Sequence, residues 1–103
     1  MINKQMKELI DAIKTADMNN HVLIHNLWDK EIEVLSFSLD ETIKYLKQAS
    51  EEEIYWCSEV WDDISSHFKS KELIDTMIEC KNKYPNIAKD LDVDIKYAVE
   101  AMK

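Results

Sequence analysis

The sequence predicts an all-α domain of about five to six helices, arranged as a compact bundle or as a stack of antiparallel helical hairpins. Apolar residues recur at intervals of three and four along most of the 103 residues, which is the period of an amphipathic helix. Serine precedes glutamate by three residues at two expected helix starts, the spacing of a capping box. The chain contains no glycine, which argues against tight β-hairpins. Its length fits a single domain, residues 1–103.

The first helix is expected over residues 3–16 and ends at a polar break that contains Asp17, Asn19 and Asn20. A second helix is expected from Val22 to Leu35. Its end is open, because Ile32 and Val34 alternate with glutamates, a pattern that also fits a short extended segment. The apolar positions that define these two helices are Ile2, Met6, Leu9, Ile10, Ile13, Ile24, Leu27, Trp28, Ile32 and Leu35.

Two capping boxes introduce the central helices. Ser38 with Glu41 precedes an apolar stripe, and Ser50 with Glu53 precedes the clearest helix of the chain, residues 51–68. The apolar face of that helix comprises Ile54, Cys57, Val60, Trp61, Ile64 and Phe68. The stripe that follows Ser38 comprises Leu39, Ile43 and Leu46.

The C-terminal part predicts two more helices. Ser70 is the expected N-cap of a helix over residues 71–84, which Pro85 ends. A last, short helix contains Ile95, Ala98, Val99 and Met102. Because only Lys69 and Ser70 separate residues 51–68 from residues 71–84, these two helices are expected to form the clearest antiparallel pair.

The net charge of −8 is concentrated in the middle of the chain. Residues 17–63 carry twelve acids against three lysines, a net charge of −9, whereas residues 1–16 carry +1 and residues 64–103 are neutral. Nucleic acid is an unsuitable partner for such a surface, because phosphate binding depends on cationic contacts. A basic protein is the expected partner, since opposite potentials steer association. The alternative is that the acids only keep the domain in solution.

Several function classes are disfavoured by what the sequence lacks. Without glycine there is no phosphate-binding loop and no dinucleotide fingerprint, so no cofactor is expected. The longest apolar run, residues 54–57, is too short to span a bilayer, and the N-terminus lacks an apolar signal core, so a cytoplasmic protein without membrane contact is expected. Cys57 and Cys80 occupy apolar-face positions and are expected to be reduced core thiols.

Three groups of polar residues suggest chemistry, and each has a simpler structural interpretation. His21, His25 and Asp29 share a helical face, but one helix cannot close a tetrahedral metal site, so no metal is expected. His67 has no nucleophile at a suitable spacing. The acid pairs within residues 51–53 and 62–63 point in different directions on a helix, and acids in a first turn favour the helix dipole. No catalytic residue is therefore predicted, and the chain is not expected to be an enzyme.

The outer face of residues 51–68 is the best candidate for a binding surface. At 100° per residue, Tyr55 lies opposite the apolar stripe and Trp56 lies on its flank, with acids beside both. Aromatic residues are enriched at binding hot spots, and surrounding acids favour a cationic partner. The alternative is that Trp56 packs under a neighbouring helix. The predicted partner-binding residues are Glu52, Tyr55, Trp56, Glu59, Asp62 and Asp63.

The pattern and order of several segments resemble small acidic immunity proteins of bacterial contact-dependent inhibition and other polymorphic toxin systems. The resemblance implies an all-helical cytosolic protein that binds and neutralises one cognate toxin domain, often a nuclease with a basic cleft, with ribonucleases favoured. It covers roughly residues 36–100 and identifies no interface residues. The segments that carry it are residues 37–43, 50–54, 58–65, 70–74, 83–85 and 94–98.

The charge pattern and the resemblance together predict an immunity protein that is a monomer outside its complex and that blocks a basic active site with carboxylates. The alternative is a helical adaptor or regulatory module that binds a host protein through the same face. A large secreted protein encoded immediately upstream would favour the first prediction over the second.

Overall fold

A computed structural model describes residues 2–103, and this part of the chain contains helices and short links but no strand. The prediction of an all-α fold is therefore confirmed. If residues 51–68 are counted as one interrupted helix, the described residues form six helices, the upper end of the predicted range. The elements are α1 (Ile2–Thr15), α2 (His21–Leu35), α3 (Leu39–Gln48), α4 (Glu51–Cys57), the 3-10 turn η1 (Ser58–Val60), α5 (Trp61–Phe68), α6 (Lys71–Lys83), the 3-10 turn η2 (Pro85–Ile87) and α7 (Ala88–Ala101).

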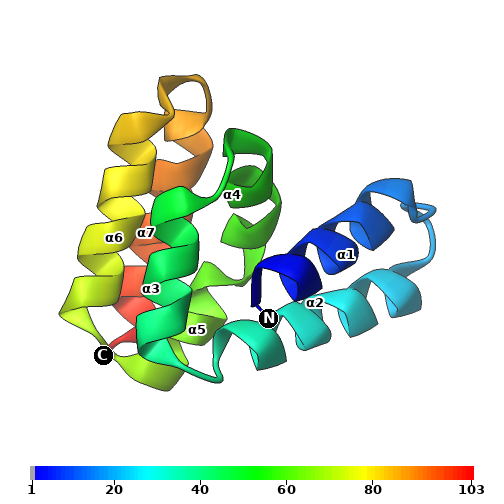
Figure 1. The fold of residues 1–103 in the computed structure, drawn as a ribbon, viewed down its shortest axis with the longest axis horizontal. Helices are drawn as coiled ribbons and strands as arrows, with labels where there is room; N and C mark the ends of the chain where they lie inside the picture. Colours follow the sequence, from blue (N-terminus) through cyan, green and yellow to red (C-terminus); the bar gives the residue numbers. More distant parts are fainter. Residues whose placement is uncertain (1) are drawn as a thin grey trace.

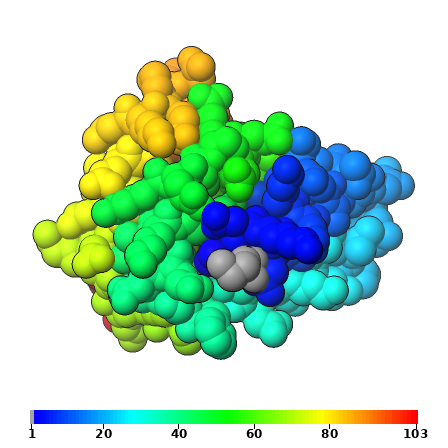
Figure 2. Space-filling model, viewed as in Figure 1, coloured from blue at the N-terminus to red at the C-terminus, as the bar shows by residue number. Residues whose placement is uncertain are grey.

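The helices form two groups that share one core. Helices α3, α6 and α7 stand side by side, and α5 packs against α7 at their base (Figure 1). Helices α1 and α2 form an antiparallel hairpin that extends to one side, where it contacts α3, α4, η1 and α5. In the space-filling view this hairpin is continuous with the central helices (Figure 2). The arrangement is consistent with the predicted compact bundle of about five to six helices.

The predicted caps form at three helix starts. Ser50 and Glu53 make the complete capping box: the Ser50 hydroxyl accepts from the Glu53 amide at 3.2 Å, and the Glu53 carboxylate accepts from the Ser50 amide at 3.4 Å. Ser70 caps α6 by accepting from the Leu73 amide. Ser38 accepts from the Glu41 amide, but no return bond from Glu41 forms, so only half of that predicted box is present.

The prediction of one continuous helix over residues 51–68 is wrong. The chain tightens into η1 at Ser58–Val60, where the Ser58 hydroxyl donates to the Tyr55 carbonyl at 2.8 Å. A serine that bonds back into the preceding turn competes with the helical pattern and bends a helix. Because a 3-10 turn advances about 120° per residue, α5 is rotated relative to the face expected from α4.

Two further helix boundaries differ from the prediction. The last helix is not short: α7 begins at Ala88, directly after η2, because Pro85 at the start of that turn leads the chain into a new helix while ending α6. The ambiguous end of α2 is helical through Leu35, so the extended alternative for Ile32 and Val34 is wrong. The Ser36 amide completes α2 by donating to the Ile32 carbonyl.

The expected pairing of residues 51–68 with residues 71–84 is also wrong, because α5 packs mainly against α7. Lys69 adopts a left-handed conformation (φ 48°, ψ 50°) at the end of α5 and turns the chain away from it. Helix α6 then packs against α3 and α7 instead. The Ser65 hydroxyl on α5 donates to the Ala98 carbonyl at 2.6 Å and ties α5 to α7.

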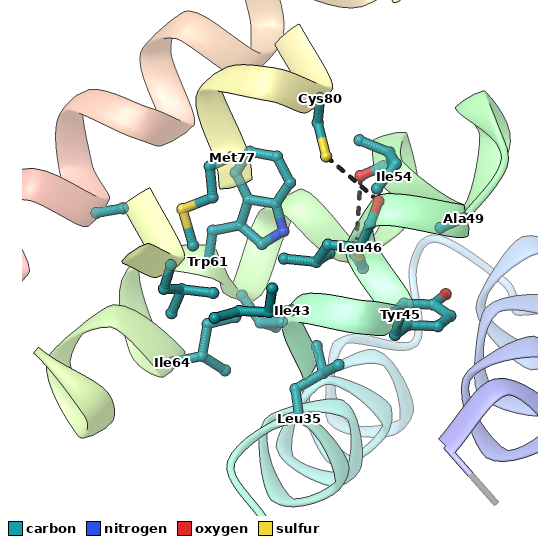
Figure 3. Packing of buried hydrophobic residues seen from close by; sticks show 14 of the residues in the cluster. Leu35, Ile43, Tyr45, Leu46, Ala49, Ile54, Trp61, Ile64, Met77 and Cys80 are labelled. Atoms are coloured by element: carbon teal, nitrogen blue, oxygen red, sulfur yellow. Dashed lines mark hydrogen bonds between the residues drawn. The ribbon is translucent and has the colours of Figure 1, made fainter. Parts of the chain in front are cut away.

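One hydrophobic core draws side chains from every α-helix. Trp61 is fully buried at its centre, and Figure 3 shows its indole beside Met77. Cys57 and Cys80 are buried free thiols, as predicted. Each thiol donates to a backbone carbonyl, Cys57 to Ile54 and Cys80 to Leu46 (Figure 3).

Lys69→Gly is expected to increase the free energy of unfolding by about 0.5–1 kcal/mol, because glycine adopts the left-handed conformation without steric cost. Chemical denaturation measures the change. Lys44→Gly, at an exposed position inside α3, is the matched control and is expected to lower stability by about 0.5–1 kcal/mol. A loss of stability in both variants would contradict the role assigned to Lys69.

Candidate functional site

An acidic groove lies between the α4–η1 segment and α7. It encloses about 270 Å³. Two of the predicted binding residues, Tyr55 and Glu59, form one wall, and α7 forms the other. The lining residues, which together define the acidic groove, are Tyr55, Ser58, Glu59, Asp90, Val93 and Asp94.

The backbone explains why these side chains meet. Tyr55 lies near the end of α4 and Glu59 lies four residues later, within η1, and both side chains line the same groove. Asp90 and Asp94 are four residues apart on α7 and therefore share one helical face. Close packing of α5 against α7 holds this face opposite η1.

The carboxylates of the groove repel one another; Asp94 is half-buried, whereas Glu59 and Asp90 are exposed. Burial raises the pKa of Glu59, Asp94 raises it further, and the Trp28 indole opposes the shift. Burial also raises the pKa of Asp94; the Ser58 hydroxyl opposes this shift, whereas Asp90 and Asp62 add to it. None of the ion pairs formed within residues 2–103 includes any of these four acids. Their charge is therefore uncompensated by the chain itself.

Apolar surface accompanies the acids. Tyr55 is 43% exposed, and its ring forms a T-shaped contact with the Trp56 ring, with centroids 5.5 Å apart. Val93 in the opposite wall is also exposed, as is Tyr97 one turn further along α7. The groove thus offers an aromatic ring and an aliphatic side chain beside carboxylates, a combination that suits the alkyl stem and charged head of a lysine or arginine.

The other predicted binding residues lie outside the groove. Glu52 is exposed and pairs with Lys14 of α1 at 2.7 Å. Trp56 is half-buried and packs against the core, as the structural alternative proposed. Asp63 is exposed, and burial, Asp62 and Asp29 of α2 raise its pKa in that order. Asp62 is half-buried and adds to the negative potential at Asp94 without lining the groove.

The sequence interpretation missed two sets of acids. Asp90 and Asp94 belong to residues 64–103, whose net charge is zero. The net charge of this segment therefore gave no sign of a local group of acids. Glu31 is fully buried, and neither carboxylate oxygen has a hydrogen-bond partner. It lies four residues after Leu27 and four before Leu35, so helical spacing alone would have placed it on the apolar face of α2.

The histidines lie on exposed helix surfaces. His21, His25 and Asp29 are all exposed, and the His25 ring forms a T-shaped contact with the Trp28 ring at a centroid distance of 5.1 Å. Across the described chain, no three histidine, cysteine or acidic side chains are grouped so as to hold a metal ion. His67 is exposed and contacts Phe68.

No protein-family model matches the chain, and no match is found among curated proteins or among solved structures. Among the helices of residues 2–103, none combines the length and apolar character needed to cross a bilayer.

Asp94→Asn is expected to lower the pKa of Glu59, because it removes the negative charge that faces Glu59 across the groove. Carbon-detected NMR of the side-chain carboxyl groups, recorded over a pH titration, measures the change. Asp92→Asn is the matched control, since Asp92 lies on the same helix but pairs with Lys81 at 3.1 Å. Equal shifts of the Glu59 pKa in both variants would show that the two groove walls do not face each other.

Proposed function

We propose that the protein is a cytoplasmic immunity protein that binds a basic surface of a cognate toxin domain through the acidic groove. The observation that carries this proposal is the set of uncompensated carboxylates beside the exposed ring of Tyr55. The resemblance of residues 36–100 to immunity proteins of polymorphic toxin systems supports the same conclusion.

The charge of the groove determines what kind of partner it favours. A lysine or arginine that enters it exchanges repulsion among Glu59, Asp90 and Asp94 for attraction to all three. A nuclease active site concentrates such cations, because it must attract phosphate. Carboxylates that occupy the positions of the substrate's phosphates therefore block the active site and compete with the nucleic acid.

The aromatic side chain supplies the second part of the interaction. Tyr55 presents a rigid ring at one wall of the groove, so a partner side chain that covers it becomes desolvated there. Buried aromatic anchors account for much of the binding energy at protein interfaces, whereas exposed charges mainly control association rate and selectivity. The proposal therefore gives Tyr55 and the acids separate kinetic roles.

A growth assay tests the function directly. If a large secreted protein is encoded immediately upstream, its toxic domain expressed alone is expected to stop growth, and co-expression of this chain is expected to restore it. Purified chain and domain are expected to form a complex. If the chain neither binds that domain nor restores growth, the immunity proposal is wrong and the adaptor alternative gains support.

The acids are expected to control association. The double variant Glu59→Gln/Asp94→Asn is expected to slow association with the toxin domain about tenfold at low salt, because steering by the groove is lost. Stopped-flow kinetics measure the rates. Glu72→Gln/Glu79→Gln removes the same charge from exposed positions on α6 and is expected to change the rate little. Similar effects of both double variants would indicate attraction by net charge alone.

Tyr55→Ala is expected to accelerate dissociation about 30-fold, equivalent to about 2 kcal/mol for an anchor residue. Surface plasmon resonance measures the rate, and thermal unfolding checks that the variant is folded. Phe37→Ala is the matched control, because Phe37 is 87% exposed and lies outside the groove. Full-strength binding by a folded Tyr55→Ala variant would place the interface elsewhere.

A further inference from the structure

Glu31 is the one acidic or basic side chain that residues 2–103 bury completely, with a relative exposure of 0%. Both of its carboxylate oxygens are buried without a hydrogen-bond partner. A buried carboxylate without a partner is strongly unfavourable, so the protonated form of Glu31 is the one compatible with this packing. The position lies on the core-facing side of α2, where the α1–α2 hairpin meets the rest of the molecule.

Acids of the hairpin face acids of the central helices. Glu31 of α2 is close enough to Glu59 of η1 for that charge to disfavour its ionisation, and Asp29 of α2 acts in the same way on Asp63 of α5. No lysine pairs with any of these four acids within the described chain. The contact between α2 and the η1–α5 segment therefore contains two acid–acid pairs and no compensating cation.

The other elements around Glu31 contribute no positive charge. Burial raises the pKa of the Tyr45 hydroxyl on α3 and that of the Cys57 thiol on α4, and ionised Glu31 adds to both shifts, so both groups lie nearby. Each is neutral under ordinary conditions. The side chains that α1 buries are apolar: Met6, Ile10 and Ile13.

We propose that the contact between α2 and the η1–α5 segment is a pH-sensitive joint, in which protonated Glu31 allows the α1–α2 hairpin to dock and ionised Glu31 loosens it. This inference does not depend on the proposed function, because it concerns only how the hairpin is attached. Loosening is expected to begin at this contact, since ionisation places a negative charge on the fully buried Glu31 side chain, close to Glu59.

The direction of the pH effect follows from the two states of Glu31. Burial, with a contribution from Glu59, raises the pKa of Glu31 from an ordinary value of 4.5 to about 8. The unfolded chain releases this proton near pH 4.5, whereas the folded chain retains it until about pH 8. Stability from Glu31 is therefore full below pH 4.5, falls between pH 4.5 and about 8, and changes no further above that range.

Glu31→Gln separates this effect from all other titrations, because glutamine has the same shape and does not ionise. The unfolding equilibrium constants of the wild type and the variant are compared from pH 4 to pH 9.5 by urea denaturation. The unfolding constant of the wild type, divided by that of Glu31→Gln, is expected to rise by up to tenfold per pH unit between about pH 5 and pH 7.5. This ratio is expected to become constant above about pH 8.5. Glu33→Gln, an exposed neighbour on α2, is expected to retain the wild-type profile. Parallel profiles for the wild type and Glu31→Gln would overturn the proposal.

Two measurements on the wild type keep the proposal testable if Glu31→Gln does not fold. Carboxyl NMR is expected to show that Glu31 titrates well above the ordinary glutamate range, and a midpoint near 4.5 would overturn the proposal. Hydrogen exchange, corrected for the intrinsic pH dependence, is expected to show protection lost from α1 and α2 before α6 and α7 as the pH rises. Simultaneous loss from all four helices would exclude a joint and would indicate global unfolding instead.

Discussion

The three-residue turn η1 (Ser58–Val60) sets the directions of α4 and α5, and several other contacts depend on it. Because the chain is redirected there, α4 packs against α1 while α5 packs against α7. A straight helix over residues 51–68 would have one axis, and Tyr55 and Glu59 would follow the phase expected from a helical wheel. In the structure η1 contacts both α2 and α7, and Glu59 of η1 lines the acidic groove together with Tyr55 of α4. The bond from the Ser58 hydroxyl to the Tyr55 carbonyl is the local interaction that accompanies this change of direction.

Glu59 connects the two electrostatic features of the molecule. On one side it faces Asp94 across the acidic groove, and on the other it is close to Glu31 at the base of the α1–α2 hairpin. A partner cation near Glu59 therefore changes the potential at both places. The positions of acids in this small protein are unfavourable for its own stability, since burial and like charges raise several of their pKa values. Under the proposed function, a partner of opposite charge relieves this repulsion.

Hydrogen bonds from hydroxyl groups fix the positions of several helix ends. Apolar packing alone does not do this, because it is not directional. Thr42 donates to the Leu35 carbonyl at 2.6 Å, Ser65 donates to Ala98, and Tyr84 donates to Ala49 at 2.7 Å. Each acceptor lies near the C-terminal end of its helix, where carbonyls have no partner within the helix. Tyr45 adds a bond to Glu53 and so links α3 to the capping box of α4. These contacts fix the helix positions on which the acidic groove depends.

The sequence by itself determined the fold class, most of the helix positions, the caps at Ser50 and Ser70, and the burial of both cysteines. These features depend on interactions within about one helical turn, or on which face of a helix is apolar, and both can be read from residue spacing. The same spacing places Glu31 on the apolar face of its helix. That an acidic residue is buried at such a position can be recognised only when its surroundings are known. The tertiary structure alone decided that η1 interrupts residues 51–68, that α5 packs on α7 rather than α6, and that Asp90 and Asp94 face Tyr55 and Glu59. The directions of the links between helices bring together residues that are far apart in the chain. Those directions depend on a few backbone angles, such as those of Lys69, which cannot be predicted from the spacing of apolar residues.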